Sequence, residues 1–245
     1  QLEPVPLPHQ EECLPYASAP APQDNLDKLI QSRRMVFIPA DAPDNLAYSE
    51  KTNINEARIV AALLERIYRM TSGTFDAYKT VGVIVPYRNQ IAMIRREIAR
   101  KGIPELAHIS IDTVERYQGS QRDVIIYSFT IQNFSQLNFL TANTFQEDEY
   151  VIDRKLNVAI TRARKQLFLT GNPQILGANI TFYKLMEYIR MNNGYSQTDT
   201  DAFCRGDFTL SEYMPGWDLQ SENYPLSEAF DHAFRHIVEE NSRIN

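Results

Sequence analysis

Cysteine, glycine and tryptophan are scarce in this 245-residue sequence, which contains two, nine and one of them, respectively. Cys13 and Cys204 lie far apart and form no CxxC pair, and near Cys13 only His9 adds a candidate ligand. This spacing does not form a zinc site, so we predict no metal ligands. The low cysteine content also favours a reducing compartment.

Long apolar runs and a leader sequence are absent as well. No apolar stretch approaches the roughly 20 residues that a membrane-spanning helix needs. No signal-peptide pattern of basic, apolar and small residues follows Gln1. We therefore expect a cytoplasmic, nuclear or nucleoid protein that is neither secreted nor embedded in a membrane. Because the first residue is not Met, we also expect the sequence to be part of a longer chain.

The net charge of −6 is unevenly distributed along the chain. Residues 80–172 contain 12 basic and 9 acidic side chains, whereas residues 1–79 and 173–245 are both net acidic. Charge within a segment is more informative about partners than the total. The basic central segment is therefore compatible with a polyanionic partner.

Apolar runs and amphipathic stretches alternate from Arg34 onwards. Strands are predicted at RMVFIP, VGVIVPY, HISID, DVIIYSFT and QLFLTGN. Helices are predicted at NINEARIVAALLERIYRM, with Asn53 and Glu56 as a capping box, and at NQIAMIRREIARKG, LNVAITRARK and ILGANITFYKLMEYIRM. This alternation predicts an α/β fold with a parallel sheet covered on both faces, whose ligands bind beyond the carboxyl ends of the strands.

The remaining stretches lack this pattern and set the predicted boundaries. Residues 1–33 are rich in proline and predict a linker or extended arm. Residues 34–191 form the predicted α/β domain, within which 131–151 fit neither period and predict a long connection. Residues 192–245 form a C-terminal extension of uncertain role, mostly irregular but with a predicted helix at 227–240.

Cationic and hydrogen-bonding side chains concentrate in three stretches that adjoin predicted strands: VPYRNQ, IDTVERYQGSQRD and KLNVAITRAR. In this fold the three stretches could converge. Guanidinium groups bind phosphate oxygens bidentately, and a glycine lets backbone N–H groups approach them closely. The alternative is a set of ordinary solvated charges. The candidate phosphate ligands are Arg88, Gln90, Thr113, Gln118, Gly119, Arg162 and Arg164.

Over residues 34–190 the sequence resembles the superfamily 1 helicases, in the branch of the nonsense-mediated-decay and Okazaki-maturation helicases. The segments that carry the resemblance are VGVIVPYRNQ in the motif IV region, TVERYQGSQRDVIIYS as motif V and LNVAITRARKQLFLTGN as motif VI. Two such motifs in order are far more specific than one. The resemblance implies the second of two RecA-like, P-loop-NTPase-type domains, which together clasp ATP and move along a single strand.

The resemblance also implies roles for individual residues. Arg162 corresponds to the arginine finger that stabilises charge on the transferred γ-phosphoryl group. Four residues would lie near the nucleotide: Gln118, Gly119, Gln121 and Arg164. Gln121 stands where this branch commonly has a glutamate, so it keeps hydrogen bonding but lacks the charge. Four others would face the nucleic acid: Tyr87, Arg88, Gln90 and Thr113.

The sequence contains no P-loop of the form GxxxxGK[ST], because none of its nine glycines precedes Lys-Ser or Lys-Thr. We interpret Asp148-Glu149 as a solvated loop rather than magnesium ligands. ATP with Mg²⁺ would therefore be bound mainly by a first RecA-like domain outside this sequence, and the isolated fragment is expected to be inactive. The expected partners are that domain and single-stranded DNA or RNA. The alternative is a non-catalytic helicase-like module that docks protein or nucleic acid.

Overall fold

A computed structural model describes residues 14–40, 51–117, 120–142, 144–147, 150–196 and 198–210. At its centre is a five-stranded sheet of order β1-β7-β4-β2-β3, in which every pair is parallel. Its strands are β1 (Met35–Pro39), β2 (Val81–Val85), β3 (Ser110–Thr113), β4 (Arg122–Ser128) and β7 (Ala163–Gly171). The five predicted strands and their parallel arrangement are confirmed.

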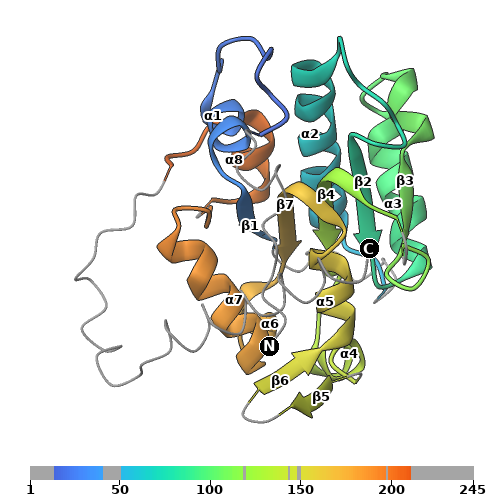
Figure 1. Ribbon diagram of the computed structural model, residues 1–245, viewed down its shortest axis with the longest axis vertical. Coiled ribbons are helices and arrows are strands. Elements are labelled where there is room, and N and C mark those ends of the chain that lie inside the picture. The colour runs from blue at the N-terminus through green and yellow to red at the C-terminus, as the bar shows by residue number, and fades with distance from the viewer. Residues whose placement is uncertain are drawn as a thin grey trace, which may run out of the picture.

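Helices cover both faces of this sheet (Figure 1). One face packs against α1 (Asn25–Ser32), α2 (Ile54–Thr71), α3 (Arg88–Ala99) and α8 (Thr200–Arg205), with a short 3-10 helix, η1, at Pro104–His108. The other face packs against α4 (Phe134–Leu140), α5 (Arg154–Ile160), α6 (Pro173–Leu176) and α7 (Ile180–Met191). The fold is therefore the expected α/β RecA-like architecture.

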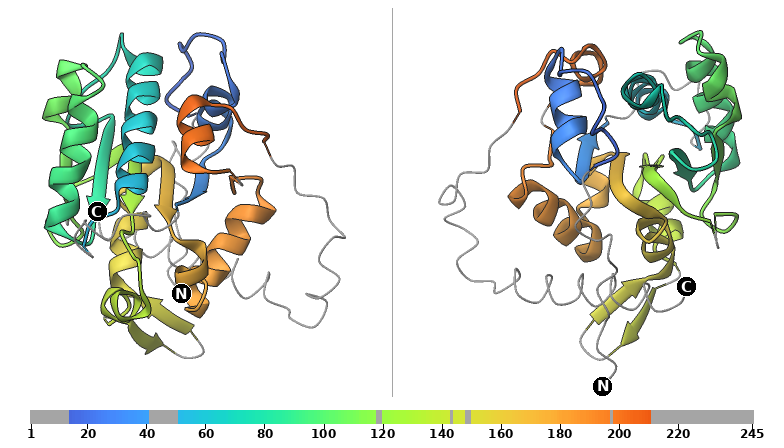
Figure 2. Two further views of the ribbon diagram at one scale, coloured as in Figure 1. Left: turned by 180° about the vertical axis from the view of Figure 1, so that it is seen from behind. Right: turned by 45° about the horizontal axis from the view of Figure 1, so that its top comes forward.

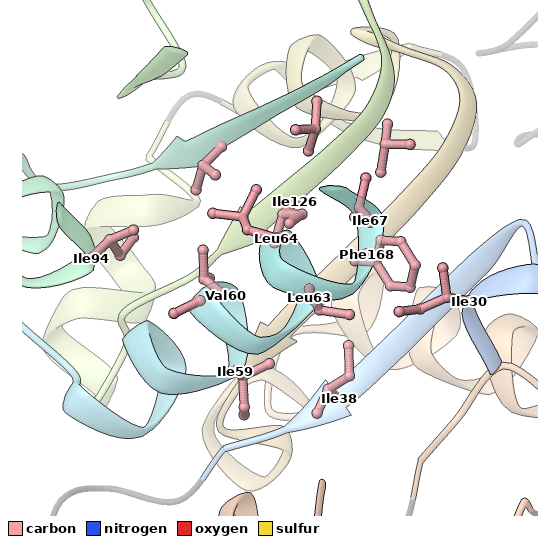
Figure 3. Close-up of a cluster of buried hydrophobic side chains, with 14 of the residues drawn as sticks. Ile30, Ile38, Ile59, Val60, Leu63, Leu64, Ile67, Ile94, Ile126 and Phe168 are labelled. Atoms are coloured by element: carbon pink, nitrogen blue, oxygen red, sulfur yellow. The ribbon is translucent and has the colours of Figure 1, made fainter. Parts of the chain in front are cut away.

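Alternating strand residues build the two hydrophobic layers. On β4, Val124 and Ile126 point to the face covered by α2. The alternate residues, Ile125 and Tyr127, point to the face covered by α7. Successive side chains on a strand face opposite ways, so a continuous apolar run is buried on both sides. Figure 3 shows how one stripe of α2 enters the first layer, with side chains Ile59, Val60, Leu63, Leu64 and Ile67.

The capping box predicted at the start of α2 is half right. Asn53 caps the helix, because its side chain accepts hydrogen bonds from the N–H groups of Asn55 and Glu56. Glu56 does not return to the Asn53 N–H as a capping box requires. Gln90 Oε1 accepts that N–H at 2.8 Å instead, so a residue of α3 completes the cap and ties the two helices together.

Three connections differ from the sequence prediction. Residues 131–151 are not one irregular connection, since they contain α4 and an antiparallel hairpin of β5 (Thr144–Glu147) and β6 (Tyr150–Asp153). The predicted helix over LNVAITRARK ends at Ile160, because pairing with β4 extends β7 back to Ala163. The predicted helix over 175–191 is two helices, since Asn172 caps α6 and Asn179 caps α7 separately.

The described ends of the chain pack onto the same core, unlike the predicted arm and extension. Tyr16 is buried and its hydroxyl donates to Gln166 Oε1 at 2.5 Å. The α1 helix is joined to α2 by Arg66, which contacts Asp24 and Asp27. Figures 1 and 2 show α8 beside α1. The rest of the predicted arm, 1–13, and of the extension, 211–245 with its expected helix, lies outside the described residues.

The described residues contain neither a candidate membrane span nor a candidate metal cluster. No helix among them is both long and apolar enough to cross a membrane. Within the same residues, no cluster of three or more His, Cys, Asp or Glu side chains is arranged to hold a metal ion.

Candidate functional site

The candidate residues occupy two opposite edges of the sheet rather than one. Tyr87 and Arg88 follow β2, and Thr113 ends β3, so these three lie at the carboxyl edge. Gln121 and Arg162 directly precede β4 and β7, which places them at the amino edge. Since all five strands are parallel, these candidate residues cannot all meet at one edge. All three motif stretches nevertheless reach the carboxyl edge, where Lys155 of the third stretch lies 3.6 Å from Glu115 of the second and over the Phe139 ring that stacks on Tyr87 of the first. The expected convergence therefore holds for the stretches but not for the whole set of candidate residues. The division instead separates the predicted nucleic-acid residues from the predicted nucleotide residues.

At the amino edge, the pairing of β4 with β7 brings the two helicase-like motifs together. The backbone N–H of Arg122 donates to the carbonyl oxygen of Arg162 at 2.9 Å, and Arg122 is in register with Ala163. Gln121 and Arg162 are therefore neighbours across the sheet although 41 positions separate them in the sequence.

The Arg162 guanidinium folds back over the end of α5. Its Nε donates to the Val158 carbonyl oxygen at 3.2 Å and its Nη2 to Thr161 Oγ1 at 3.1 Å. Partial burial lowers the pKa of Arg162. Within the described part of the chain it pairs with no carboxylate, so this cation is held by neutral oxygens alone. A guanidinium in that state keeps its charge available for an incoming anion.

Arg164 has a different environment from Arg162. It lies on β7 and is half exposed, and its Nε is 3.2 Å from Asp123 Oδ1. Lys165 Nζ is 3.7 Å from the other oxygen of Asp123. Asp123 therefore partly neutralises two cations beside the end of β4, which reduces their attraction for a phosphate.

Gln118 and Gly119 lie outside the described residues, but the loop that leads to them is anchored at Tyr117. The Tyr117 hydroxyl donates to the Ser110 carbonyl oxygen at 2.8 Å, and its ring packs over Gly82 of β2. A Cβ at position 82 would lie 2.1 Å from the Tyr117 oxygen, so only glycine admits the ring there. Burial raises the pKa of Tyr117 to about 12, which keeps its hydroxyl protonated as the donor.

At the carboxyl edge, Tyr87 is the N-cap residue of α3 and makes no side-chain cap, and Arg88 is the exposed first residue of the helix. Uncapped N–H groups at a helix start favour anions. Thr113 is partly buried, and its hydroxyl hydrogen-bonds to Glu115. Burial opposes ionisation of Glu115, but hydrogen bonds, including that from Thr113, and the nearby Lys155 lower its pKa overall.

Gln90 has no exposed surface in this structure. Its amide Nε2 donates to the Asn53 carbonyl oxygen at 2.9 Å and to Ser128 Oγ at 3.3 Å. Ser128 in turn donates to Glu56 Oε2 at 2.6 Å. This arrangement makes Gln90 part of the scaffold beneath the carboxyl edge rather than a surface ligand.

Sequence reasoning missed the buried network around Glu56 and assigned that residue only to a cap. The signal for it was present, because Ser128 and Thr130 stand in DVIIYSFT where a strand buried on both faces ends. Polar side chains in such a place need internal partners. It also missed Asp123, the acidic residue of β4 that contacts Arg164 and Lys165 of β7.

Comparisons with known proteins agree with this architecture. A family model described as an AAA domain (AAA_12) matches residues 12–174. The chain is 32% identical over 122 residues to putative helicase MOV-10 of Gallus gallus. The aligned region is 48% of this chain and 12% of that protein.

Two further relatives match over comparable spans. RNA helicase Mov10l1 of Mus musculus is 32% identical over 126 residues, or 49% of this chain and 10% of the relative. The DNA replication ATP-dependent helicase/nuclease DNA2 of Mus musculus is 30% identical over 131 residues, or 54% of this chain and 11% of the relative. The aligned part is thus about a tenth of each relative's length. The chain belongs to the AAA domain family, in the superfamily 1 branch of the nonsense-mediated-decay and Okazaki-maturation helicases.

Proposed function

We propose that this chain is the C-terminal, second RecA-like motor domain of an ATP-dependent superfamily 1 helicase that acts on DNA or RNA. It would supply the arginine finger and part of the nucleic-acid track, and hydrolysis would require a first RecA-like domain with a P-loop. The observation that carries this proposal is the state of Arg162. Its guanidinium lies where motifs V and VI meet and has no carboxylate partner among the described residues.

The residues of the amino edge fit the triphosphate of ATP. Arg162 and Arg164 provide cations, and Gln121 provides neutral hydrogen-bonding groups beside them. Arg162 would move from the α5 carbonyl to the γ-phosphate when a first motor domain presents ATP. Mg²⁺, held mainly by that first domain, would neutralise charge on the phosphates as they react.

The carboxyl edge fits the phosphate backbone of a single strand. Arg88 is an exposed cation, and the first N–H groups of α3 lack a side-chain cap. Thr113 and Tyr87 lie beside it and add hydroxyl groups. Gln90 would act from below, by fixing the start of α3 against α2.

The test is Arg162→Ala in the full-length protein. Because the finger acts on charge that develops during phosphoryl transfer, nucleotide binding should persist while the hydrolysis rate falls by roughly 10³-fold or more. Arg58→Ala is the matched control, since Arg58 is a partly exposed arginine that pairs with Asp201 of α8. Near-normal hydrolysis by Arg162→Ala would overturn the finger assignment. A full-length protein without any nucleic-acid-stimulated hydrolysis would favour the non-catalytic docking module.

A further inference from the structure

Two aromatic rings from distant parts of the chain stack at the carboxyl edge. The Tyr87 ring, at the start of α3, and the Phe139 ring, on α4, have centroids 5.8 Å apart and planes inclined by 20°. Phe139 nevertheless remains 53% exposed. A large ring that already has one stacking partner therefore still presents apolar surface to solvent.

Lysine side chains lie over both rings. Lys155 Nζ, at the start of α5, is 4.6 Å from the Phe139 centroid, and Lys51 Nζ is 6.0 Å from the Tyr87 centroid. Arg88 is exposed directly after Tyr87. Among the described residues, two acidic groups lie near Lys155: Glu115, whose Oε1 is 3.6 Å from Lys155 Nζ, and the buried Asp153. The three cations outnumber these two acids in the described part of the chain, which suits an aromatic ligand with attached anions.

A second exposed aromatic residue on the same helix shows what is particular to Phe139. Phe134 of α4 is 61% exposed, so exposure of a ring on this helix is not unusual by itself. Within the described part of the chain, however, Phe134 takes part in neither an aromatic stack nor a cation–π contact. The combination of a stacked partner, flanking lysines and solvent access belongs to Phe139.

We propose that Tyr87 and Phe139 form a stacking platform for a nucleobase of a single strand, with Lys155 and Arg88 beside its phosphates. This inference rests on the proposed function and adds a base contact on α4 to it. A single strand is the occupant that fits, because its bases offer free faces for stacking while its backbone supplies the complementary charge. In a duplex those faces are already covered by neighbouring base pairs.

The platform predicts binding that depends on bases as well as on charge. The probe is a fluorescein-labelled oligothymidine of about 12 nucleotides, compared with an abasic oligomer of the same length and charge. Anisotropy titration of the 245-residue chain should give an affinity roughly 10-fold or more higher for oligothymidine, since the abasic oligomer has no base to stack on the rings. Phe139→Leu should abolish this preference and leave the salt dependence unchanged.

Three further variants make the result specific. Phe139→Trp should retain the preference, since it keeps a stacking surface, and Phe134→Leu should match the unsubstituted chain. Arg88→Ala should weaken both oligomers equally, because it removes a phosphate contact. Equal affinity for the two oligomers, or an undiminished preference in Phe139→Leu, would overturn the platform and leave nucleic-acid binding intact. Failure to bind either oligomer at low salt would overturn both the platform and the proposed nucleic-acid function.

Discussion

The buried carboxyl group of Glu56 holds the backbone of Thr130, whose N–H donates to Oε2 at 2.8 Å and to Oε1 at 3.0 Å. Thr130 has φ of 55°, a left-handed conformation that costs a threonine roughly 1 to 3 kcal/mol. It directs the chain from β4 towards α4, which carries Phe139. A residue of α2 thereby fixes the turn that positions one ring of the proposed platform.

We predict that the free energy of unfolding depends on pH through Glu56. Burial raises its pKa from 4.5 to about 8, and hydrogen bonds from Ser128 and Thr130 only partly oppose this shift. Because the folded-state pKa is the higher one, the stabilisation is fully present below about pH 4.5 and is lost as pH rises through about 8. Urea unfolding across that range should show a Glu56-dependent loss on the order of 3 to 5 kcal/mol.

Two substitutions separate ionisation of Glu56 from its contacts. Glu56→Gln keeps an acceptor for the Thr130 N–H and a polar group for Ser128 but cannot ionise, so it should remove this part of the pH dependence. Glu56→Ala leaves the Thr130 N–H buried without its partner and creates a cavity, and should cost about 3 kcal/mol or more at low pH, with a smaller cost as pH rises through about 8. An unchanged pH profile in Glu56→Gln would show that other groups cause the dependence.

The parts of the fold that were predictable from sequence are those set by local pattern. β1, β2, β4 and β7 contain apolar runs that are buried on both faces, and α2 and α3 have helical periodicity with apolar stripes. The misassigned stretches depend on tertiary contacts instead. The sequence pattern of LNVAITRARK predicts a helix that includes Arg164, yet pairing with β4 places this residue on β7. Helix α1 was not predicted, because the segment before it is rich in proline. Its position depends on the ion pairs of Asp24 and Asp27 with Arg66 of α2.

The site was predictable only as a set of residues. The resemblance to motif VI predicted Arg162 as a site residue, but its proximity to Gln121 depends on the β4–β7 register, and no local pattern encodes that register. Gln90 illustrates the opposite case. An amide beside Arg88 resembles a ligand in sequence, whereas the structure directs it inward to Asn53 and Ser128. Side-chain direction at a helix start is determined by the neighbouring helix, which sequence alone did not reveal.

The close approach of Tyr117 to β2 predicts that Gly82→Ala is destabilising. The added Cβ would lie 2.1 Å from the Tyr117 oxygen and 3.0 Å from its Cζ, within a parallel sheet that cannot easily shift. Overpacking of this kind costs about 1 to 3 kcal/mol. Gly73→Ala is the control, because no atom lies within 4 Å of a Cβ there. Thermal unfolding should distinguish the two variants, and equal melting temperatures would contradict the packing argument.

Asp123 is predicted to weaken nucleotide binding in the full-length protein by neutralising Arg164 and Lys165. Asp123→Asn removes that negative charge with little change in shape, so ATP affinity should rise a few-fold. The free energy of unfolding should change by less than about 1 kcal/mol, since Arg164 is half exposed and such pairs contribute little. Asp201→Asn is the matched control, because it frees Arg58 on α2, which is not one of the amino-edge cations. Isothermal titration with a non-hydrolysable ATP analogue measures the effect. If the affinity does not rise in Asp123→Asn, or rises equally in Asp201→Asn, Asp123 does not influence nucleotide binding.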